Sequence, residues 1–250
     1  MNDIATQSHI SPELNPVMSK DVESMLKAGI HLGHSKSKNH PAMQPYIFGV
    51  RNTIAIIDVI KTEAKLAGAM DFVREIAGRG GMILFVGTRP GTRHVVLDTA
   101  EKAGMPYFIE RWIGGTLTNY KMISKRIEQM ETLEKERETG GFDKYTKKER
   151  ARLDDEITRL RRFFNGLRKL RRMPDAVFVL DITHDTTAVA EAKKMKIPVI
   201  ALCDSNSNID LISYPIPSND HALPAVVFML GKFTEAIEEG KRQAVEKKTE

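Results

Sequence analysis

The 250-residue sequence has a single cysteine, Cys203, a single tryptophan and no long apolar run. One cysteine excludes a disulfide framework within the chain and favours a reducing compartment. No apolar stretch approaches the roughly 20 residues that a membrane-spanning helix needs, and the first twenty residues lack the apolar core of a signal peptide. We therefore expect a cytoplasmic protein without a membrane partner, in which residues 1–18 form a flexible polar tail.

Nucleotide-binding motifs are also missing. The glycine-containing turn at residues 87–93 follows an apolar run and precedes a predicted helix, a position where helix amides can bind phosphate. However, neither the P-loop pattern nor the three-glycine dinucleotide fingerprint is present. Arg89 and Arg93 can hold a nucleic-acid phosphate without any nucleotide chemistry. We favour that interpretation over a free nucleotide and expect no cofactor.

Three short apolar runs, at residues 82–86, 176–180 and 199–203, organise the sequence. Such runs are typical of strands that are covered on both faces in a parallel sheet. The segments around them have helical spacing, at residues 61–77, 94–103, 186–196 and 221–240. This alternation predicts an α/β fold, with a Rossmann- or flavodoxin-like parallel sheet and helices on both faces. We also expect a short helix at residues 21–28, a hairpin of residues 46–49 and 54–58 around Arg51-Asn52, and a further strand at residues 105–112.

An insertion of helical character separates the two parts of this pattern. Apolar residues recur at Ile123, Ile127 and Met130, and again from Leu153 to Leu167 at alternating spacings of four and three. The sequence thus predicts an antiparallel coiled-coil helical hairpin with its tip at residues 139–145. Thr146-Lys-Lys-Glu149 reads as a capping box that starts the second helix, and we expect the basic run 168–172 to close that helix. The predicted organisation is an α/β domain of residues 19–120 and 173–240, the inserted hairpin 121–172, and a charged C-terminal tail 241–250.

Positive charge is concentrated in this insertion. Residues 121–172 carry 17 Lys/Arg and 10 Asp/Glu, a net charge of +7, whereas the rest of the chain has a net charge of −2. A charged helical hairpin is often only a solvated surface. An excess of one sign nevertheless indicates a polyanionic partner, because solubility alone is better served by balanced charges.

Two other groups of residues allow different interpretations. Asp181 and Asp204 follow predicted neighbouring strands, where α/β enzymes place catalytic groups, and they could hold Mg²⁺ in a hydrolase or phosphotransferase. His31, His34 and His40 could be metal ligands, although no thiolate or paired carboxylate lies nearby in the sequence. No positioned nucleophile or base accompanies the two aspartates, so we expect neither an enzyme nor a metal site. A third alternative is a scaffold whose hairpin grips another protein.

Several motifs together resemble a known family. They are Gly29-Ile-His-Leu-Gly-His34, Pro45-Tyr-Ile-Phe-Gly49, Leu84-Phe-Val-Gly-Thr88, Arg111-Trp-Ile-Gly-Gly-Thr-Leu-Thr-Asn119, Thr146-Lys-Lys-Glu149 and Tyr214-Pro-Ile-Pro-Ser-Asn-Asp220. In this order, over roughly residues 25–240, they resemble the bacterial type of the universal family of small-subunit ribosomal protein two. His221 departs from the family pattern, which usually has Asp at this position.

The resemblance implies a Rossmann-like domain with a helical hairpin that sits on small-subunit rRNA between head and body of the subunit. It also implies recruitment of the large mRNA-binding ribosomal protein, other small-subunit proteins as neighbours, and no catalysis. We expect a ribosomal component that is not a homo-oligomer and binds 16S-type rRNA mainly through phosphates. The candidate RNA-binding residues are Lys36, Lys38, Arg51, Arg89, Arg93, Arg111, Lys121, Lys125, Lys147, Lys148, Arg168, Lys169, Arg171 and Arg172.

Overall fold

A computed structural model describes residues 19–249, so the predicted tail 1–18 lies outside the described residues. The centre is a five-stranded parallel sheet with strand order β5-β4-β6-β7-β8. Its strands are β4 (Ile83–Val86), β5 (Tyr107–Phe108), β6 (Ala176–Val179), β7 (Val199–Cys203) and β8 (Tyr214–Pro217). Every residue of β4, β6 and β7 is buried, which explains why these strands read as continuous apolar runs.

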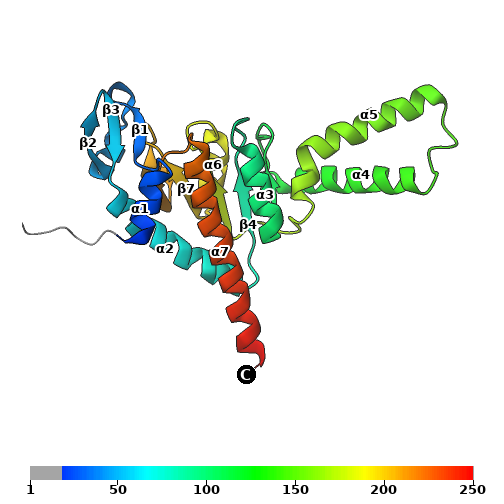
Figure 1. The fold of residues 1–250 in the computed structure, drawn as a ribbon. Coiled ribbons are helices and arrows are strands. Elements are labelled where there is room, and N and C mark those ends of the chain that lie inside the picture. The colour runs from blue at the N-terminus through cyan, green and yellow to red at the C-terminus, as the bar shows by residue number, and fades with distance from the viewer. Residues whose placement is uncertain (1–18, 250) are drawn as a thin grey trace, which may run out of the picture.

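Helices cover both faces of this sheet (Figure 1). They are α1 (Lys20–Lys27), α2 (Val59–Gly78), α3 (Arg93–Ala103), α6 (Thr186–Lys194) and α7 (Leu223–Thr249). Ile83 and Phe85 of β4 point into the hydrophobic core that contains α2, α3 and α7. Leu84 and Val86 point into a second core, which contains α6 and the base of the insertion. The predicted α/β architecture is therefore confirmed.

A small antiparallel sheet, with strand order β1-β3-β2, precedes the main one. It consists of β1 (Leu32–Ser35), β2 (Ile47–Arg51) and β3 (Ile54–Ile57), with the 3-10 turns η1 (Lys36–Lys38) and η2 (Pro41–Tyr46) between β1 and β2. The predicted hairpin forms between β2 and β3. Asn52 and Thr53 at its turn both have positive φ, of 47° and 67°, as a type I′ turn requires.

The insertion forms two helices, α4 (Tyr120–Glu138) and α5 (Lys147–Phe164), which project together from the sheet (Figure 1). At about 1.5 Å per residue, helices of this size reach roughly 25–30 Å. The predicted stripes are buried between them: Ile127, Met130 and Ile157 are at most 3% exposed. Thr146 and Glu149 form the predicted capping box. The pair is a helical hairpin, and its coiled-coil packing stays a prediction.

Three boundaries differ from the sequence-based expectation. The strand expected at residues 105–112 is only Tyr107–Phe108, because it is an edge strand that pairs with two residues of β4. Helix α5 ends at Phe164, before the basic run, and continues as the 3-10 turn η3 (Asn165–Leu167). There Gly166 lies so close to Tyr107 that a Cβ atom would overlap its carbonyl oxygen. This position therefore accepts only glycine.

The third difference is at the C-terminus, where α7 continues through the residues predicted as a tail and ends at Thr249.

A further 3-10 turn, η4 (Ile209–Leu211), follows β7. Among the described residues, no helix is long and apolar enough to cross a membrane.

Two glycines of α7 give a matched test of the packing against α2. A Cβ atom at Gly240 would overlap the Arg74 carbonyl oxygen and lie 2.9 Å from the Cβ of Ala77, whereas one at Gly231 would meet nothing within 4 Å. Gly240→Ala should lower the free energy of unfolding by about 1–3 kcal/mol. Gly231→Ala should raise it by up to about 1 kcal/mol through helix propensity. Urea denaturation measures both, and equal effects would contradict this packing.

Candidate nucleic-acid interface

The segment 112–118, which precedes α4, is bound by one carboxylate, that of Glu191 on α6. This side chain accepts hydrogen bonds from Trp112 Nε1 at 3.2 Å, and from the backbone amides of Gly115 at 2.7 Å, Leu117 at 3.0 Å and Thr118 at 3.1 Å. The Thr118 hydroxyl donates a fifth bond, at 3.0 Å. Because α6 packs against the sheet, these five bonds fix the base of the hairpin relative to the α/β body.

The Glu191 carboxylate is charged in this setting. Burial disfavours the ionised form, but the donors from Thr118, Gly115, Trp112 and Leu117 outweigh it and hold the pKa of Glu191 below its usual value. By sequence, the N-cap of the helix that follows could be Thr118 or Asn119. Asn119 occupies the position but makes no capping bond through its side chain. Glu191, which is 73 to 79 residues away from these donors in the chain, satisfies the amides instead.

A second buried carboxylate joins α4 to α5 and to the segment that follows α5. Glu134 of α4 is bound by Arg161 of α5 and, through two bonds of 2.6 and 2.7 Å, by Arg168. The bonds from Arg168 and, next to them, Arg161 outweigh the effect of burial and lower the pKa of Glu134 to about 2. Arg168, a predicted RNA contact, is therefore engaged within the chain.

Four other predicted RNA-binding arginines also have carboxylate partners. Arg89 forms a close pair with buried Asp181. The remaining pairs are Arg93–Glu110 at 3.1 Å, Arg171–Glu131 at 3.1 Å and Arg172–Asp175 at 2.9 Å. Their charge is already partly compensated inside the protein.

The other nine predicted cations are exposed and form no ion pair with any side chain described between residues 19 and 246. They lie in three places. Lys36, Lys38 and Arg51 are on the small sheet and its turn, Arg111 is at the base of the hairpin, and Lys121, Lys125, Lys147, Lys148 and Lys169 are on or next to α4 and α5. Arg126 and Arg152, which are not among the predicted contacts, are also exposed on the hairpin. The same charge excess could have identified them.

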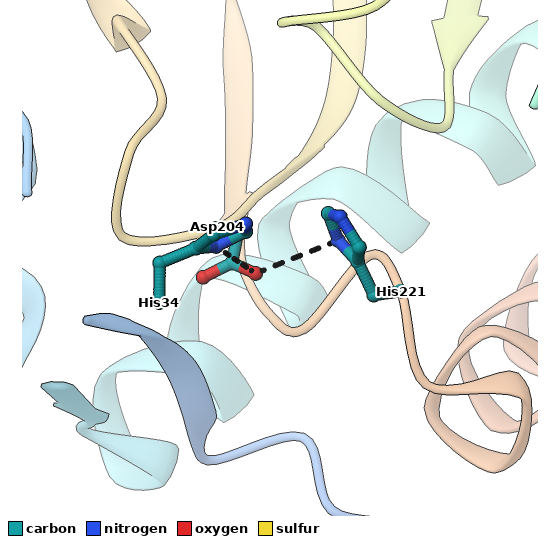
Figure 2. A group of neighbouring side chains, drawn as sticks. All are labelled: His34, Asp204 and His221. Atoms are coloured by element: carbon teal, nitrogen blue, oxygen red, sulfur yellow. Dashed lines mark ion pairs between the residues drawn. The ribbon is translucent and has the colours of Figure 1, made fainter. Parts of the chain in front are cut away.

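The structure also gathers His34, Asp204 and His221 at the carboxyl edge of the sheet (Figure 2). His34 Nδ1 lies 2.9 Å and His221 Nδ1 3.9 Å from the Asp204 carboxylate, and the two imidazole rings meet edge to face. Of the three histidines considered as ligands, only His34 is in this cluster, and its carboxylate neighbour Asp204 lies 170 residues away in the chain. Two imidazoles and a carboxylate, with ligand atoms within 4.8 Å of one another, are ligand types that suit Zn²⁺. The side chains present therefore fit a divalent metal.

Asp220 adds a further buried carboxylate beside this cluster. It contacts His221 closely, and burial raises its pKa to about 6. Asp181, the other aspartate considered for Mg²⁺, is instead bound by Arg89 and by Thr183. Asp181 and Asp204 thus have separate partners, and this geometry does not favour the catalytic two-carboxylate interpretation.

A doubly wound α/β body with a rigidly attached, cation-rich helical hairpin defines a class of structural protein suited to a polyanionic assembly. The chain belongs to the family described as ribosomal protein S2, whose family model matches residues 25–240. The small ribosomal subunit protein uS2 from each of two strains of Thermus thermophilus is 43% identical to it over 225 residues, covering 90% of this chain and 88% of the relative.

Membership confirms the resemblance and decides the broad function. The family is structural and non-enzymatic, and in bacteria it is part of the small subunit of the cytoplasmic ribosome. The chain is therefore a structural ribosomal protein that sits among rRNA and other ribosomal proteins. The hydrolase and phosphotransferase interpretations are set aside.

Replacing Glu191 tests its role at the base of the hairpin. Glu191→Gln keeps the shape but removes the charge from five hydrogen bonds, and it should lower the free energy of unfolding by about 2–4 kcal/mol. The exposed Glu138, which has no partner among the described side chains, provides the control Glu138→Gln, expected to change stability by less than about 0.5 kcal/mol.

The same carboxylate makes stability depend on pH. Because the pKa of Glu191 is lower in the folded than in the unfolded chain, its contribution is complete above the unfolded-state pKa and is lost as pH falls through the folded-state value. The difference in stability between the wild-type chain and Glu191→Gln should shrink accordingly in acid. A difference that does not change with pH would contradict this assignment.

Proposed function

We propose that the chain binds small-subunit rRNA through the nine exposed cations, and that the hairpin is the principal contact. The observation that supports this best is the net charge of +7 on residues 121–172, of which α5 carries +3 and the run 168–172 at the base of the hairpin carries +4. Internal ion pairs use the buried acid Glu134 and several arginines, while the lysines of the hairpin face outward. Unpaired ammonium groups on a rigid arm suit phosphate oxygens.

Lysine at exposed helix positions offers a point charge rather than a planar fork. Such contacts position a protein on an RNA backbone and read its shape, and they carry little sequence information. The five paired arginines, Arg89, Arg93, Arg168, Arg171 and Arg172, remain in the proposed contact set. Each must share its guanidinium with a carboxylate, so we expect each to contribute less than an exposed lysine.

We further propose that the hairpin packs as an antiparallel coiled coil and that residues 19–120 and 173–240 form the α/β domain beside it. The protein would sit, as one copy, between head and body of the small subunit. Support comes from the family membership and from the buried stripes on the facing helices.

Removing charge from the hairpin tests RNA binding. Changing Lys121, Lys125, Lys147 and Lys148 together to glutamine should weaken binding to a small-subunit rRNA fragment. It should also reduce the slope of log K against log salt by about one for each phosphate that the variant no longer binds. Filter binding at several salt concentrations gives both quantities.

The matched control removes four lysines from the body, with the changes Lys20→Gln, Lys102→Gln, Lys193→Gln and Lys194→Gln. These side chains are also exposed, so the change in net charge is equal. The control should change affinity and slope much less. Equal losses in both variants would mean that only net charge matters, and a flat salt response of the wild-type chain would contradict the proposal altogether.

A second surface has a different character and supports the proposed recruitment of the large mRNA-binding ribosomal protein. On the small sheet, Phe48 is 80% exposed and Val50 47%, and the two alternate positions of β2 share one face. Exposed apolar side chains of this size are typical of a protein interface rather than an RNA contact. We propose that a neighbouring ribosomal protein covers them.

Phe48→Ser tests this second surface. The side chain is outside the core, so folding and rRNA binding should be unchanged. Retention of the mRNA-binding protein on small subunits that contain the variant should fall several-fold in a sedimentation assay. Unaltered retention would exclude this sheet as the recruiting surface.

A further inference from the structure

The base of the hairpin contains an aromatic side chain, Phe163, that is only partly used in packing. Leu160 and Phe164 of α5 are 4% and 7% exposed and belong to the stripe that packs against α4. Phe163 lies outside this stripe and is only partly buried. It faces two hollows, one on the side of the helices and one on the side of the glycine turn.

The two hollows share Phe163 as a wall. One, of about 290 Å³, is lined by Arg111, Trp112, Ile113, Gly114 and Phe163. The other, of about 220 Å³, is lined by Arg126, Arg159, Leu160, Phe163 and Phe164. Both are smaller than the roughly 300–1,000 Å³ of pockets for drug-sized ligands. Each suits a single flat ring rather than a whole metabolite.

Arginines stand at the rim of both hollows. Arg111 and Arg126 are exposed, and neither has a carboxylate partner in the part of the chain that is described. Arg159 is paired with Glu156 at 2.6 Å. The guanidinium of Arg162 lies 5.6 Å from the centre of the Phe163 ring and is paired with Glu110. The mouth therefore combines an aromatic surface with free positive charge.

The geometry points to a subsite for unpaired RNA bases at Phe163, in which a base enters either hollow beside the ring while Arg111 and Arg126 hold the flanking phosphates. This inference rests on the proposed function and adds base recognition to it. Single-stranded RNA is commonly bound by aromatic side chains that stack with bases and by arginines that contact the backbone. The hydrogen bonds of Glu191 to Trp112 and Gly115 make the larger hollow rigid before RNA arrives.

The position of the only tryptophan gives a direct readout. Trp112 lines the larger hollow, and the chain contains no other tryptophan. A base that enters should therefore change the intrinsic fluorescence of the full-length chain. Binding of the backbone elsewhere on the hairpin should leave this signal almost unchanged.

The experiment titrates the full chain with three probes of equal length and charge: oligouridine, oligoadenosine and an abasic ribose-phosphate oligomer. We expect saturable quenching of Trp112 by the two base-containing probes and none by the abasic one. Phe163→Leu, which keeps an apolar side chain but removes the aromatic face, should weaken binding of the base-containing probes about 5- to 150-fold and leave abasic binding unchanged.

Two further variants complete the test. Phe163→Tyr retains the ring and should bind like wild type, and Phe48→Leu is the control for loss of an exposed aromatic side chain far from the site. Equal affinity and equal quenching for abasic and base-containing probes on the wild-type chain would overturn the inference, whether or not any variant folds. So would an unchanged affinity of Phe163→Leu for the base-containing probes, measured by the same quenching of Trp112.

Binding of labelled small-subunit rRNA, measured in parallel by anisotropy, separates the two proposals. If rRNA binds tightly but the base-dependent signal is absent, only the base subsite is wrong. If rRNA does not bind at all, the proposed function is wrong and the subsite with it.

Discussion

The direction in which the hairpin projects depends on the Glu191 carboxylate, which binds the segment 112–118 just before α4. An arm of two helices can serve an assembly only if its direction is fixed, and a loop between an edge strand and a helix would not fix it alone. One charged carboxylate that accepts five hydrogen bonds does so, because each donor lies in the segment 112–118 and the acceptor lies on a helix of the body. Leaving these buried donors unsatisfied would lower the stability of the fold. The hydrogen bonds to Glu191 therefore hold the hairpin to the α/β domain.

The same use of carboxylates shapes the charge of the arm. Glu134 forms ion pairs with Arg161 and Arg168, and Glu110 forms ion pairs with Arg93 and Arg162. These pairs hold α4, α5 and the body together. Arginines take part in all of these pairs, whereas Lys121, Lys125, Lys147, Lys148 and Lys169 stay exposed without a carboxylate partner among the described side chains. The electrostatic interactions that stabilise the arm and those proposed to meet rRNA are thus separated in space.

Much of the architecture was predictable from local patterns. Buried parallel strands are short apolar runs, the hairpin stripes follow helical spacing, and the capping box at Thr146 is a purely local signal. What failed or was missed depends on contacts between distant residues. Nothing near Glu191 in the sequence indicates its partners, and the need for glycine at position 166 comes from Tyr107, 59 residues earlier.

The candidate sites show the same limit. Composition located the cationic arm, but it could not distinguish exposed lysines from arginines already paired with carboxylates. Spacing along the chain grouped His34 with His31 and His40 as possible metal ligands, whereas the fold places it beside Asp204 and His221. The sequence shows how many charges a segment carries, but only the fold shows which of them remain unpaired and exposed.

The central claim is that the hairpin lies against rRNA, and tethered cleavage measures this most directly. Cys203 is buried, so a cysteine introduced by Lys125→Cys can carry an iron chelate that generates hydroxyl radicals in assembled small subunits. We expect strong cleavage of the small-subunit rRNA backbone close to this position. Assembled subunits that carry the label but show no rRNA cleavage would contradict the claim.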